Sequence, residues 1–542
     1  MERAAIGRRV PGPLGEEPYR AALVELALEV ERMAASGELR REKLERLKLE
    51  VARKYSLDRV PSNSELAALL RGRARRLVAS RPSRRLSGIV TVTVAAMPYD
   101  CPPNARCIYC PGGPREGTPK SYVRESPSVI QASRSGYDPR AQVEERISTL
   151  ERLGHPTSKV EVIVVGGTFL YYPPSYQVDF IKGIFEGLNG RRASSLEEAM
   201  SENEKSAHRC VGLTVETRPD FCTERHVDLM LSYGVTRVEI GVQSLDDRTL
   251  LRIGRGHGVA EVRRAIRVAK DAGLKVGVHM MPCLPGRTLE DDVGDLLRLF
   301  EDESYRPDML KIYPTLVLRG TPLQRMYERG LYKPCSEGEV LELLVRVLSS
   351  LPPWVRVMRV QREIPPYAVV AGPRTTGLRD LALKEIARRG LRCTEIRCRE
   401  VGRAGVDPSE LHRFGLARRE YAASGGLEVF LSMEDEDGRV AGFLRLRRPS
   451  PLAHRPEVAG KGVALVRELR VYGSEVDVGD RDDGGWQHRG IGRALMEEAE
   501  RVARDEWGLE EILVTSAVGT REYYRRLGYD RLGPYMAKRL RP

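Results

Sequence analysis

Three cysteines, Cys101, Cys107 and Cys110, lie close together in a loop rich in glycine and proline. This loop directly follows the apolar, strand-like stretch 89–96. A structural zinc ion takes four ligands, whereas three thiolates suit a [4Fe–4S] cluster whose fourth iron stays open for a substrate or cofactor. Binding S-adenosylmethionine (SAM) at that iron and cleaving it to a radical is the chemistry that such a site serves. A zinc site completed by a distant fourth ligand is the alternative.

Short apolar segments alternate with amphipathic helical segments after this loop. The predicted strands cover residues 160–165, 211–215, 237–242, 275–281 and 309–313. Repeated strand–helix units imply parallel strands joined by right-handed crossovers, and such strands form a barrel or partial barrel. We therefore expect the chemistry in the loops at the carboxyl ends of the strands.

Four of these predicted strands end in loops that are suited to hold a ligand. Gly166 and Gly167 follow the first strand, and glycine lets backbone amides approach a ligand closely. Glu216 and Gln243 follow the next two, where they offer donors and acceptors to an amino acid or a ribose. The fourth strand leads into residues 282–286. Because all four loops are expected on one rim beside the cysteine loop, we predict a SAM site there.

The pattern changes after Gly425 to a meander of predicted strands at 427–432, 440–447 and 463–471. A polar loop then leads into a turn and a helix that reaches about residue 507; the turn contains Gln487, Gly490, Ile491, Gly492 and Arg493. Backbone N–H groups and the helix dipole at such a turn can hold a pyrophosphate. Together with a strand at 512–515 and the pair Tyr523 and Tyr524, this pattern is typical of a coenzyme A-binding N-acetyltransferase of the GNAT type.

Basic residues are concentrated in one part of the chain. The whole chain has 89 lysines and arginines against 76 acidic residues. Residues 51–88 contain ten basic and two acidic residues, whereas residues 1–50, which read as amphipathic helices, contain ten of each. A local excess of this kind is the electrostatic footprint of a phosphate backbone, so we expect a nucleic-acid partner. A solvated helical face is the alternative.

Cysteine content and hydropathy limit the class of protein. Nine cysteines in 542 residues do not form the dense framework of a secreted disulfide protein. No apolar run approaches the roughly 20 residues that span a bilayer, and the N-terminus has no signal-type apolar region. We therefore expect a soluble, cytoplasmic protein.

The combination of motifs closely resembles the family of the Elongator catalytic subunit and its stand-alone archaeal and bacterial relatives. The resemblance covers about residues 85–542. It is most specific at 101–114, 159–169, 216–220, 239–244, 279–285, 311–320, 467–474 and 519–529. It implies an α/β fold class in which a radical-SAM partial (β/α) barrel is fused to a GNAT-type α+β domain after a basic helical segment. The implied domains are 1–84, which binds tRNA, 85–385, with the radical-SAM barrel, and 386–542, with the acetyltransferase and its preceding linker.

The resemblance also implies roles for particular residues. Cys101, Cys107 and Cys110 would ligate the cluster, although the first gap here is wider than in most radical-SAM enzymes. Lys159 matches a lysine that contacts acetyl-CoA at the mouth of the barrel. The other matched acetyl-CoA contacts are Glu468, Leu469, Arg470, Val471, Ile491, Gly492 and Arg493. Tyr524 matches a tyrosine near the coenzyme A sulfur, but spacing does not choose between it and Tyr523.

Cys335, Cys393 and Cys398, with a histidine such as His412, could form a structural zinc site between the two catalytic domains. The resemblance implies such a site in prokaryotic relatives. Buried free cysteines are the alternative reading.

Two classes of function account for these motifs. The first is a tRNA-modifying enzyme that uses SAM radical chemistry and acetyl-CoA to build a carboxymethyl group on carbon-5 of the wobble uridine, in the anticodon loop. The second is a protein lysine acetyltransferase in which the barrel is only structural. A non-catalytic RNA-binding scaffold is a third possibility, but it leaves the cofactor motifs without a role.

Overall fold

The computed structural model describes residues 16–39, 41–57, 60–70, 74, 78, 89–404, 406, 408–473 and 490–540. Contacts divide the chain into two compact units, Met1–Arg85 with Glu145–Thr157, and Leu86–Glu144 with Ser158–Pro542. Gln487 and most of the basic cluster lie outside the described residues; those basic residues are Arg59, Arg71, Arg73, Arg75, Arg76, Arg81, Arg84 and Arg85. The division into three domains at 84/85 and 385/386 stays a prediction.

The described residues before Arg85 in the first unit form the helices α1 (Glu16–Ala35), α2 (Arg41–Lys54) and α3 (Asn63–Leu69). Leu26 and Val30 of α1 and Leu44 and Val51 of α2 are buried in one apolar cluster. These residues recur at three- and four-residue spacing, which places them on one face of each helix. The helices expected from that spacing are therefore confirmed.

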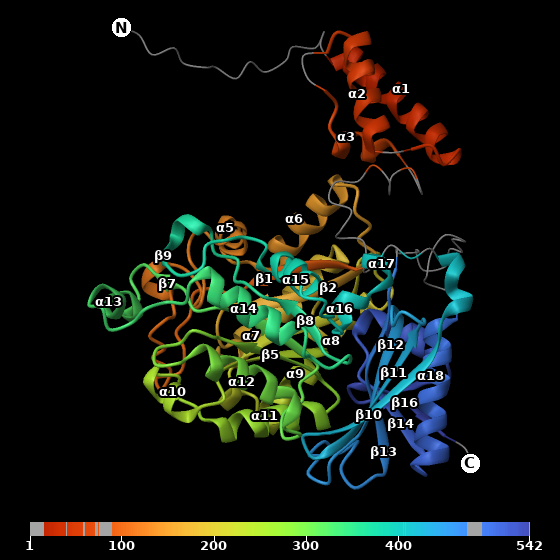
Figure 1. Ribbon diagram of the computed structural model, residues 1–542. Coiled ribbons are helices and arrows are strands. Elements are labelled where there is room, and N and C mark those ends of the chain that lie inside the picture. The colour runs from red at the N-terminus through yellow and green to blue at the C-terminus, as the bar shows by residue number, and fades with distance from the viewer. Residues whose placement is uncertain are drawn as a thin grey trace. The chain divides into compact units, whose positions relative to one another are not determined.

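A seven-stranded, wholly parallel sheet forms the first half of the second unit, in the order β1-β2-β3-β4-β5-β6-β8 (Figure 1). The strands are β1 (Val90–Ala95), β2 (Lys159–Val165), β3 (Arg209–Thr217), β4 (Arg237–Gln243), β5 (Lys275–Met280), β6 (Met309–Ile312) and β8 (Arg356–Arg359). Because neighbours in the sheet follow one another in the chain, each crossover turns in the same sense and the sheet curls into an open barrel.

Helices connect and cover these strands. They are α5 (Pro127–Arg134), α6 (Pro139–Arg152), α7 (Pro174–Asn189), α8 (Leu196–Asn203), α9 (Glu224–Ser232), α10 (Asp247–Arg252), α11 (Val259–Asp271), α12 (Leu289–Glu301), α13 (Pro322–Glu328), α14 (Glu337–Leu348), α15 (Leu378–Arg388), α16 (Ile396–Arg399) and α17 (Val401–Ala404). The short strands β7 (Val317–Leu318) and β9 (Val369–Ala371) pair beside the barrel. The expected partial barrel is confirmed.

The second half of this unit is a mostly antiparallel sheet in the order β10-β11-β12-β13-β14-β16-β15. Its strands are β10 (Gly415–Ala423), β11 (Gly426–Glu434), β12 (Val440–Arg448), β13 (Val463–Val471), β14 (Glu511–Val514), β15 (Asp530–Leu532) and β16 (Tyr535–Arg539). Its helices are α18 (Ile491–Arg501) and α19 (Arg521–Arg525). Strand β10 was not expected, because the meander was predicted to begin only after Gly425.

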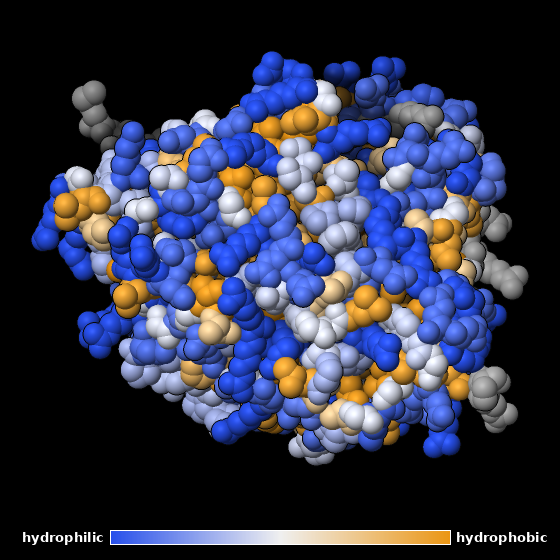
Figure 2. Space-filling view, turned by 60° about the horizontal axis from the view of Figure 1, so that its bottom comes forward, coloured by the Kyte–Doolittle hydropathy of each residue, from blue (hydrophilic) through white to orange (hydrophobic). Residues whose placement is uncertain are grey.

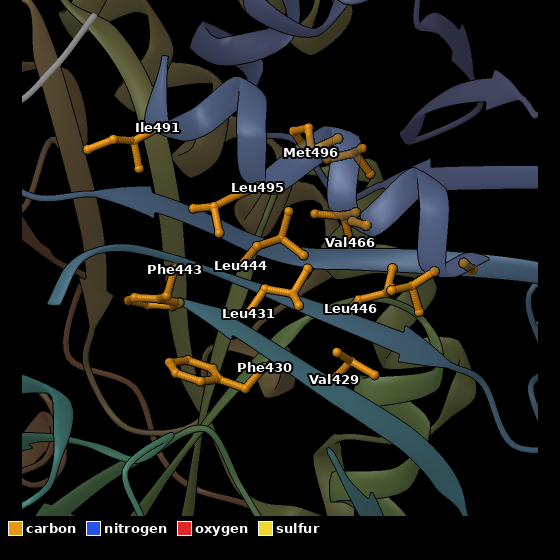
Figure 3. Packing of buried hydrophobic residues seen from close by; sticks show 14 of the residues in the cluster. Val429, Phe430, Leu431, Phe443, Leu444, Leu446, Val466, Ile491, Leu495 and Met496 are labelled. Atoms are coloured by element: carbon orange, nitrogen blue, oxygen red, sulfur yellow. The ribbon is translucent and has the colours of Figure 1, made fainter. Parts of the chain in front are cut away.

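Helix α18 packs on this sheet through apolar side chains. Figure 3 shows Leu495 of the helix directed toward Leu444, with Ile491 and Met496 on the same helix and Leu431 on the next strand. All five are buried. This packing fixes the first turn of α18 beside the end of β13, where acetyl-CoA was predicted to bind.

The sheet that begins with β10 lies against the amino ends of the barrel strands through buried charges. Both guanidinium Nη atoms of Arg467 on β13 donate to Asp308, which directly precedes β6, at 2.7 Å. Arg467 also donates to Glu428 of β11, and Arg447 of β12 donates to Asp271 at the end of α11 at 2.6 Å. These five side chains are fully buried. Because a buried charge is costly without its partner, the network fixes how the two sheets meet.

On the face shown in Figure 2, hydrophilic residues predominate and hydrophobic residues occur in separate small groups. Apolar atoms are common on protein surfaces, so scattered groups of this size need no further explanation. In the described part of the chain, no helix is both long and apolar enough to span a membrane.

Candidate active site

The three-cysteine loop lies at the carboxyl end of the barrel. Cys101, Cys107 and Cys110 follow β1 and line one cavity of about 160 Å³. Gly167, Glu216 and Gln243, at or just beyond the ends of β2, β3 and β4, line the same cavity. The strands are parallel, so their carboxyl ends meet at one rim. Residues that are far apart in the sequence thus surround a single space.

The thiols affect one another. Burial, together with the neighbouring Cys110 and Cys107, raises the pKa of Cys101 to about 11. Burial and Cys107 also raise the pKa of Cys110. Three thiolates this close together repel one another unless a cation is bound between them. The donor set therefore fits an iron–sulfur cluster, in which the irons supply that positive charge.

The rim also holds polar groups without partners among the described residues. The side-chain oxygen of Gln243 and one Nη atom of Arg218 are buried in the cavity wall with no hydrogen-bond partner there. Gly167 has a φ of +90°, and a Cβ at this position would stand 3.2 Å from the Lys120 side chain. Buried polar groups are almost always paired, so these groups fit a polar ligand such as SAM.

The inner part of the cavity is charged. Its residues lie in stretches that carry the family resemblance, but a role was predicted only for Glu216. Glu239 of β4 accepts a hydrogen bond from Lys311 of β6 and lies 2.9 Å from Nε2 of His279 on β5. Lys311 also lies 3.6 Å from Glu216. Burial would raise the pKa of Glu239, but Lys311 and His279 hold it well below its usual range. Alternation of charged and small residues along these strands is the signal that could have identified this cluster.

The predicted acetyl-CoA residues lie where two strands separate. Strands β13 and β14 pair from Val463 and Glu511 up to Val466 and Val514. Beyond Val466, strand β13 pairs only with β12. This part of β13 contains the predicted contacts Glu468, Leu469, Arg470 and Val471. Alternate backbone groups of a strand point to opposite sides, so some of these groups face the gap left by β14. Buried hydroxyls of Thr515 and Ser516 at the end of β14 have no partner among the described residues, which fits a polar ligand here.

The turn before α18 lies beside that gap. Gly490 precedes the helix with a φ of +85°, and Ile491 begins it. A Cβ at Gly492 would stand 2.8 Å from the Tyr523 hydroxyl and 3.7 Å from Val471. The structure therefore brings together three predicted contacts, Val471, Gly492 and Tyr523, and Arg493 follows in the first turn of the helix.

The two candidate tyrosines differ in environment. Tyr523 is 38 % exposed, and its hydroxyl lies over the first turn of α18. Tyr524 is buried in the apolar core of the domain, with its ring against those of Tyr523 and Tyr529. Burial raises the pKa of Tyr524 well above that of an exposed tyrosine, so its hydroxyl stays protonated. The geometry thus favours Tyr523 as the group next to the turn, whereas the resemblance favoured Tyr524.

Lys159 is not at the mouth of the barrel that the cysteines line. It is the first residue of β2, so it lies at the amino end, opposite the cavity. Glu161, two residues further on, shares its side of the strand. Burial alone would raise the pKa of Glu161, but Arg237 and Arg470 lower it to about 2. Lys159 therefore lies on the side of the barrel that faces β13.

The structure brings the predicted zinc set together only in part: Cys393 and Cys398 lie beside Glu395, whereas Cys335 lies elsewhere, so a zinc site stays a prediction. Cys335 is paired with Cys283, with Cα atoms 5.8 Å apart, and Cys393 is paired with Cys398. His412 is exposed and directs Nδ1 toward the Ser409 carbonyl. Cys283 follows β5 directly, so the fold takes Cys335 to the barrel loops instead of to the other two cysteines.

Comparison with known proteins agrees with both halves of this architecture. Residues 101–300 match the radical SAM superfamily, residues 307–388 match the radical SAM C-terminal domain, and residues 398–529 match the acetyltransferase (GNAT) family. With the two observed sheets, these matches confirm the predicted fold class.

Several proteins are similar over nearly the whole chain. Elongator complex protein 3 of Danio rerio is 44% identical over 92% of this chain and 93% of its own. A tRNA uridine(34) acetyltransferase of Methanocaldococcus jannaschii is 42% identical over 93% of this chain and 95% of its own. The solved structure of Methanocaldococcus infernus Elp3 with an N-terminal deletion is 42% identical, with a TM-score of 0.73, and covers 84% of this chain and 100% of that one.

Proposed function

Since the chain belongs to the family of Elongator complex protein 3 and the tRNA uridine(34) acetyltransferases, we propose that it modifies the wobble uridine of tRNA. We propose further that the product carries a carboxymethyl group on carbon-5. The observation that carries this proposal is a single compact unit with a three-cysteine cavity at one end of a barrel and an acetyltransferase sheet at the other.

Cys101, Cys107 and Cys110 would hold the [4Fe–4S] cluster in this proposal. When bound, the cluster would supply the electron that cleaves SAM, and the radical formed would take a hydrogen atom from the acetyl methyl of acetyl-CoA. The new carbon radical would add to carbon-5 of the uridine. Loss of the carbon-5 proton, with return of one electron to the oxidised cluster, would restore the double bond of the base. Hydrolysis of the thioester then leaves the carboxymethyl group. The cavity walls hold the reacting groups away from water, because the strands and their loops enclose them.

Four predicted residues orient SAM in this arrangement. The backbone of Gly166 and Gly167 can approach it closely because both have positive φ angles. The unpartnered side-chain oxygen of Gln243 and the Glu216 carboxylate are available to its amino and ribose groups. Zinc has no part in the proposal.

Acetyl-CoA would bind between β13 and α18. Its amide-bearing arm would take hydrogen bonds from the strand backbone at 468–471, and its pyrophosphate would contact the turn at Gly490–Arg493. The Tyr523 hydroxyl lies above that turn, where it can donate a hydrogen bond to the coenzyme. Lys159, on the same side of the barrel, adds a positive charge near the thioester end.

The two cofactor regions are separated by the length of the barrel. Strand β2 has seven residues, so its ends are about 20 Å apart. The cysteines lie beyond its carboxyl end, and Glu161, next to Arg470, lies near its amino end. The proposal therefore requires the arm of acetyl-CoA to carry the acetyl group over this distance.

The cavity also offers groups suited to an RNA base. Tyr122 and Tyr313 line it together with Arg359 and Arg362. Proteins that read single-stranded RNA stack unpaired bases on aromatic rings and arginine planes. A loop nucleotide such as the wobble uridine is unpaired and can enter such a site, while basic residues in 51–88 would contact the tRNA backbone.

Anaerobic incubation of the reconstituted protein with tRNA, SAM, acetyl-CoA and a reductant tests the proposal. Digested tRNA is expected to contain 5-carboxymethyluridine by mass spectrometry, and omission of either cofactor should abolish it. Acetylation of lysine-containing peptides without any change in the uridine would instead support the lysine acetyltransferase reading. A protein that binds tRNA but turns over neither cofactor would support the scaffold reading.

A further inference from the structure

The cysteine loop is held by the segment that follows α10, residues 253–257. The backbone N–H groups of Arg106 and Ile108 donate to the carbonyls of Gly254 and Ile253 at 2.8 and 3.0 Å. The Asn104 side chain donates to the Gly256 carbonyl at 2.8 Å. The two segments are about 150 residues apart in the sequence, so this contact is created only by the fold.

Glycines allow this close contact. Gly254 and Gly256 have φ angles of +66° and +75°. A Cβ at Gly254 would stand 2.6 Å from the Arg106 carbonyl oxygen, and one at Gly256 would collide with the Asn104 carbonyl. The residue between them, Arg255, is therefore held in a fixed position against the cysteine loop.

Arg255 is buried, and each of its three nitrogens has a defined neighbour. Nη1 lies 3.6 Å from the Cys107 sulfur. Nη2 donates to the Gly241 carbonyl at 2.5 Å, and Nε donates to Nε2 of His257 at 3.0 Å. Gly241 makes this possible, because a Cβ there would stand 2.5 Å from Nη2.

His257 is suited to accept this hydrogen bond because it is neutral. Burial, and then the charge of Arg255, lowers the pKa of His257 to about 3. Its Nδ1 lies 3.4 Å from the Gly258 carbonyl, to which it can donate. That tautomer leaves Nε2 free to accept from Arg255. The guanidinium is thus fixed on one side by His257 and on the other by Gly241, with its remaining nitrogen on the Cys107 sulfur.

We infer that Arg255 sets the reduction potential of the cluster by donating an N–H···S hydrogen bond from a fixed positive charge to Cys107. This inference rests on the proposed function, since it requires the cluster. Hydrogen bonds to ligand sulfurs and nearby charge are among the factors that set iron–sulfur potentials. A cation beside a ligand sulfur stabilises the state with one more electron, so Arg255 raises the potential and makes reduction easier.

The hydrogen-bond neighbour of Cys110 is a neutral hydroxyl, whereas that of Cys107 is the charged Arg255. Cys110 lies 3.6 Å from the Ser121 hydroxyl, which carries no charge. Reduction takes one electron from an external one-electron donor and changes no bond to Arg255. Because the titration is done without SAM and acetyl-CoA, the effect of Arg255 should appear in the redox equilibrium itself.

The test is a redox titration of the full-length, anaerobically reconstituted protein with dithionite as the reductant, followed by electron paramagnetic resonance. Arg255→Gln removes the charge and keeps a polar side chain. We expect wild-type iron content and at least a tenfold fall in the equilibrium constant for reduction, which is about 59 mV for a one-electron couple. Arg255→Lys keeps a charge without the planar fork and should give a smaller fall. Arg248→Gln, on the exposed side of α10, removes the same charge away from the sulfur and should leave the potential unchanged.

Each outcome has a distinct meaning. An Arg255→Gln protein with full iron content and the wild-type potential overturns the inference. If that variant binds no iron, Arg255→Met, which also lacks the charge and the N–H donors, is titrated instead, and a potential equal to that of the wild type would equally overturn the inference. A wild-type protein that assembles no cluster contradicts the proposed function and is recognised by its iron content before any variant is measured.

Discussion

Replacing Cys107 with alanine is expected to abolish cluster assembly and SAM cleavage. Three thiolates are the whole protein contribution to the proposed cluster, and the loss of one leaves too few ligands to hold it. Binding of acetyl-CoA should remain within about twofold of the wild type, because its predicted groove lies at the opposite end of the barrel from Cys107. Iron and sulfide assays, 5′-deoxyadenosine release and a coenzyme A binding isotherm measure these three properties.

Cys222→Ala is the matched control for this experiment. Cys222 is a free cysteine that is buried against the Ala265 carbonyl and does not line the cavity. It should keep its iron and its SAM cleavage. Wild-type iron content in Cys107→Ala would refute the assignment of the loop as the cluster site.

Asp308→Asn is expected to produce the largest loss of stability among single substitutions at the junction of the two sheets. Asp308 is fully buried and is bound by Arg467, with Lys270 3.6 Å away. Removing one partner of a buried ion pair leaves the other charges uncompensated, which costs about 3–5 kcal/mol. The measurement is urea unfolding followed by tryptophan fluorescence, since Trp354 lies at the junction and accepts a hydrogen bond from Arg445 on its carbonyl.

The dependence of stability on pH should also show that the Asp308 carboxylate is ionised in the folded protein. Burial alone would raise the pKa of Asp308, but Arg467 and Lys270 hold it far below its usual range. A carboxyl with a lowered pKa stabilises the fold above its unfolded-state pKa, about 3.9, and this stabilisation is lost as the pH falls toward the folded-state pKa. The wild type should therefore lose stability below about pH 4, and Asp308→Asn should lose less.

Asp437→Asn provides the control, because Asp437 pairs with Arg439 while its side chain is 63 % exposed. Exposed ion pairs contribute little to stability, so the urea midpoint should not change. Equal midpoints for Asp308→Asn and the wild type would mean that the buried network does not hold the sheets together.

Local patterns in the sequence were enough to predict the main architecture. The spacing of Cys101, Cys107 and Cys110 and the glycines after β2 are local signals, and so is the alternation of strands and helices. Parallel strands must bring their carboxyl ends to one rim, so Glu216 and Gln243 could be placed beside the cysteines without coordinates. The order of strand, turn and helix likewise predicted the acetyltransferase-like half, whereas the separation of β13 from β14 is seen only in the structure.

Contacts between distant segments could not be predicted. Arg255 reaches Cys107 across 148 positions, and nothing in the spacing of either residue indicates this. In the sequence, the buried charged residues at the junction cannot be distinguished from exposed charged residues of a strand, because their partners lie beside the other sheet. Cys335 was grouped with Cys393 on residue type and on the family resemblance, whereas the fold pairs it with Cys283. Strand β10 was missed because its burial does not alternate in a regular apolar pattern.

If SAM and acetyl-CoA react with each other in one active protein, deuterium on the acetyl methyl should pass to the 5′-deoxyadenosine. The wild-type protein is reduced anaerobically with tRNA, SAM and acetyl-CoA that carries three deuterium atoms on its methyl group. We expect the 5′-deoxyadenosine formed to contain one deuterium atom and the modified uridine to retain two. Modified uridine together with 5′-deoxyadenosine that contains no deuterium would contradict this mechanism.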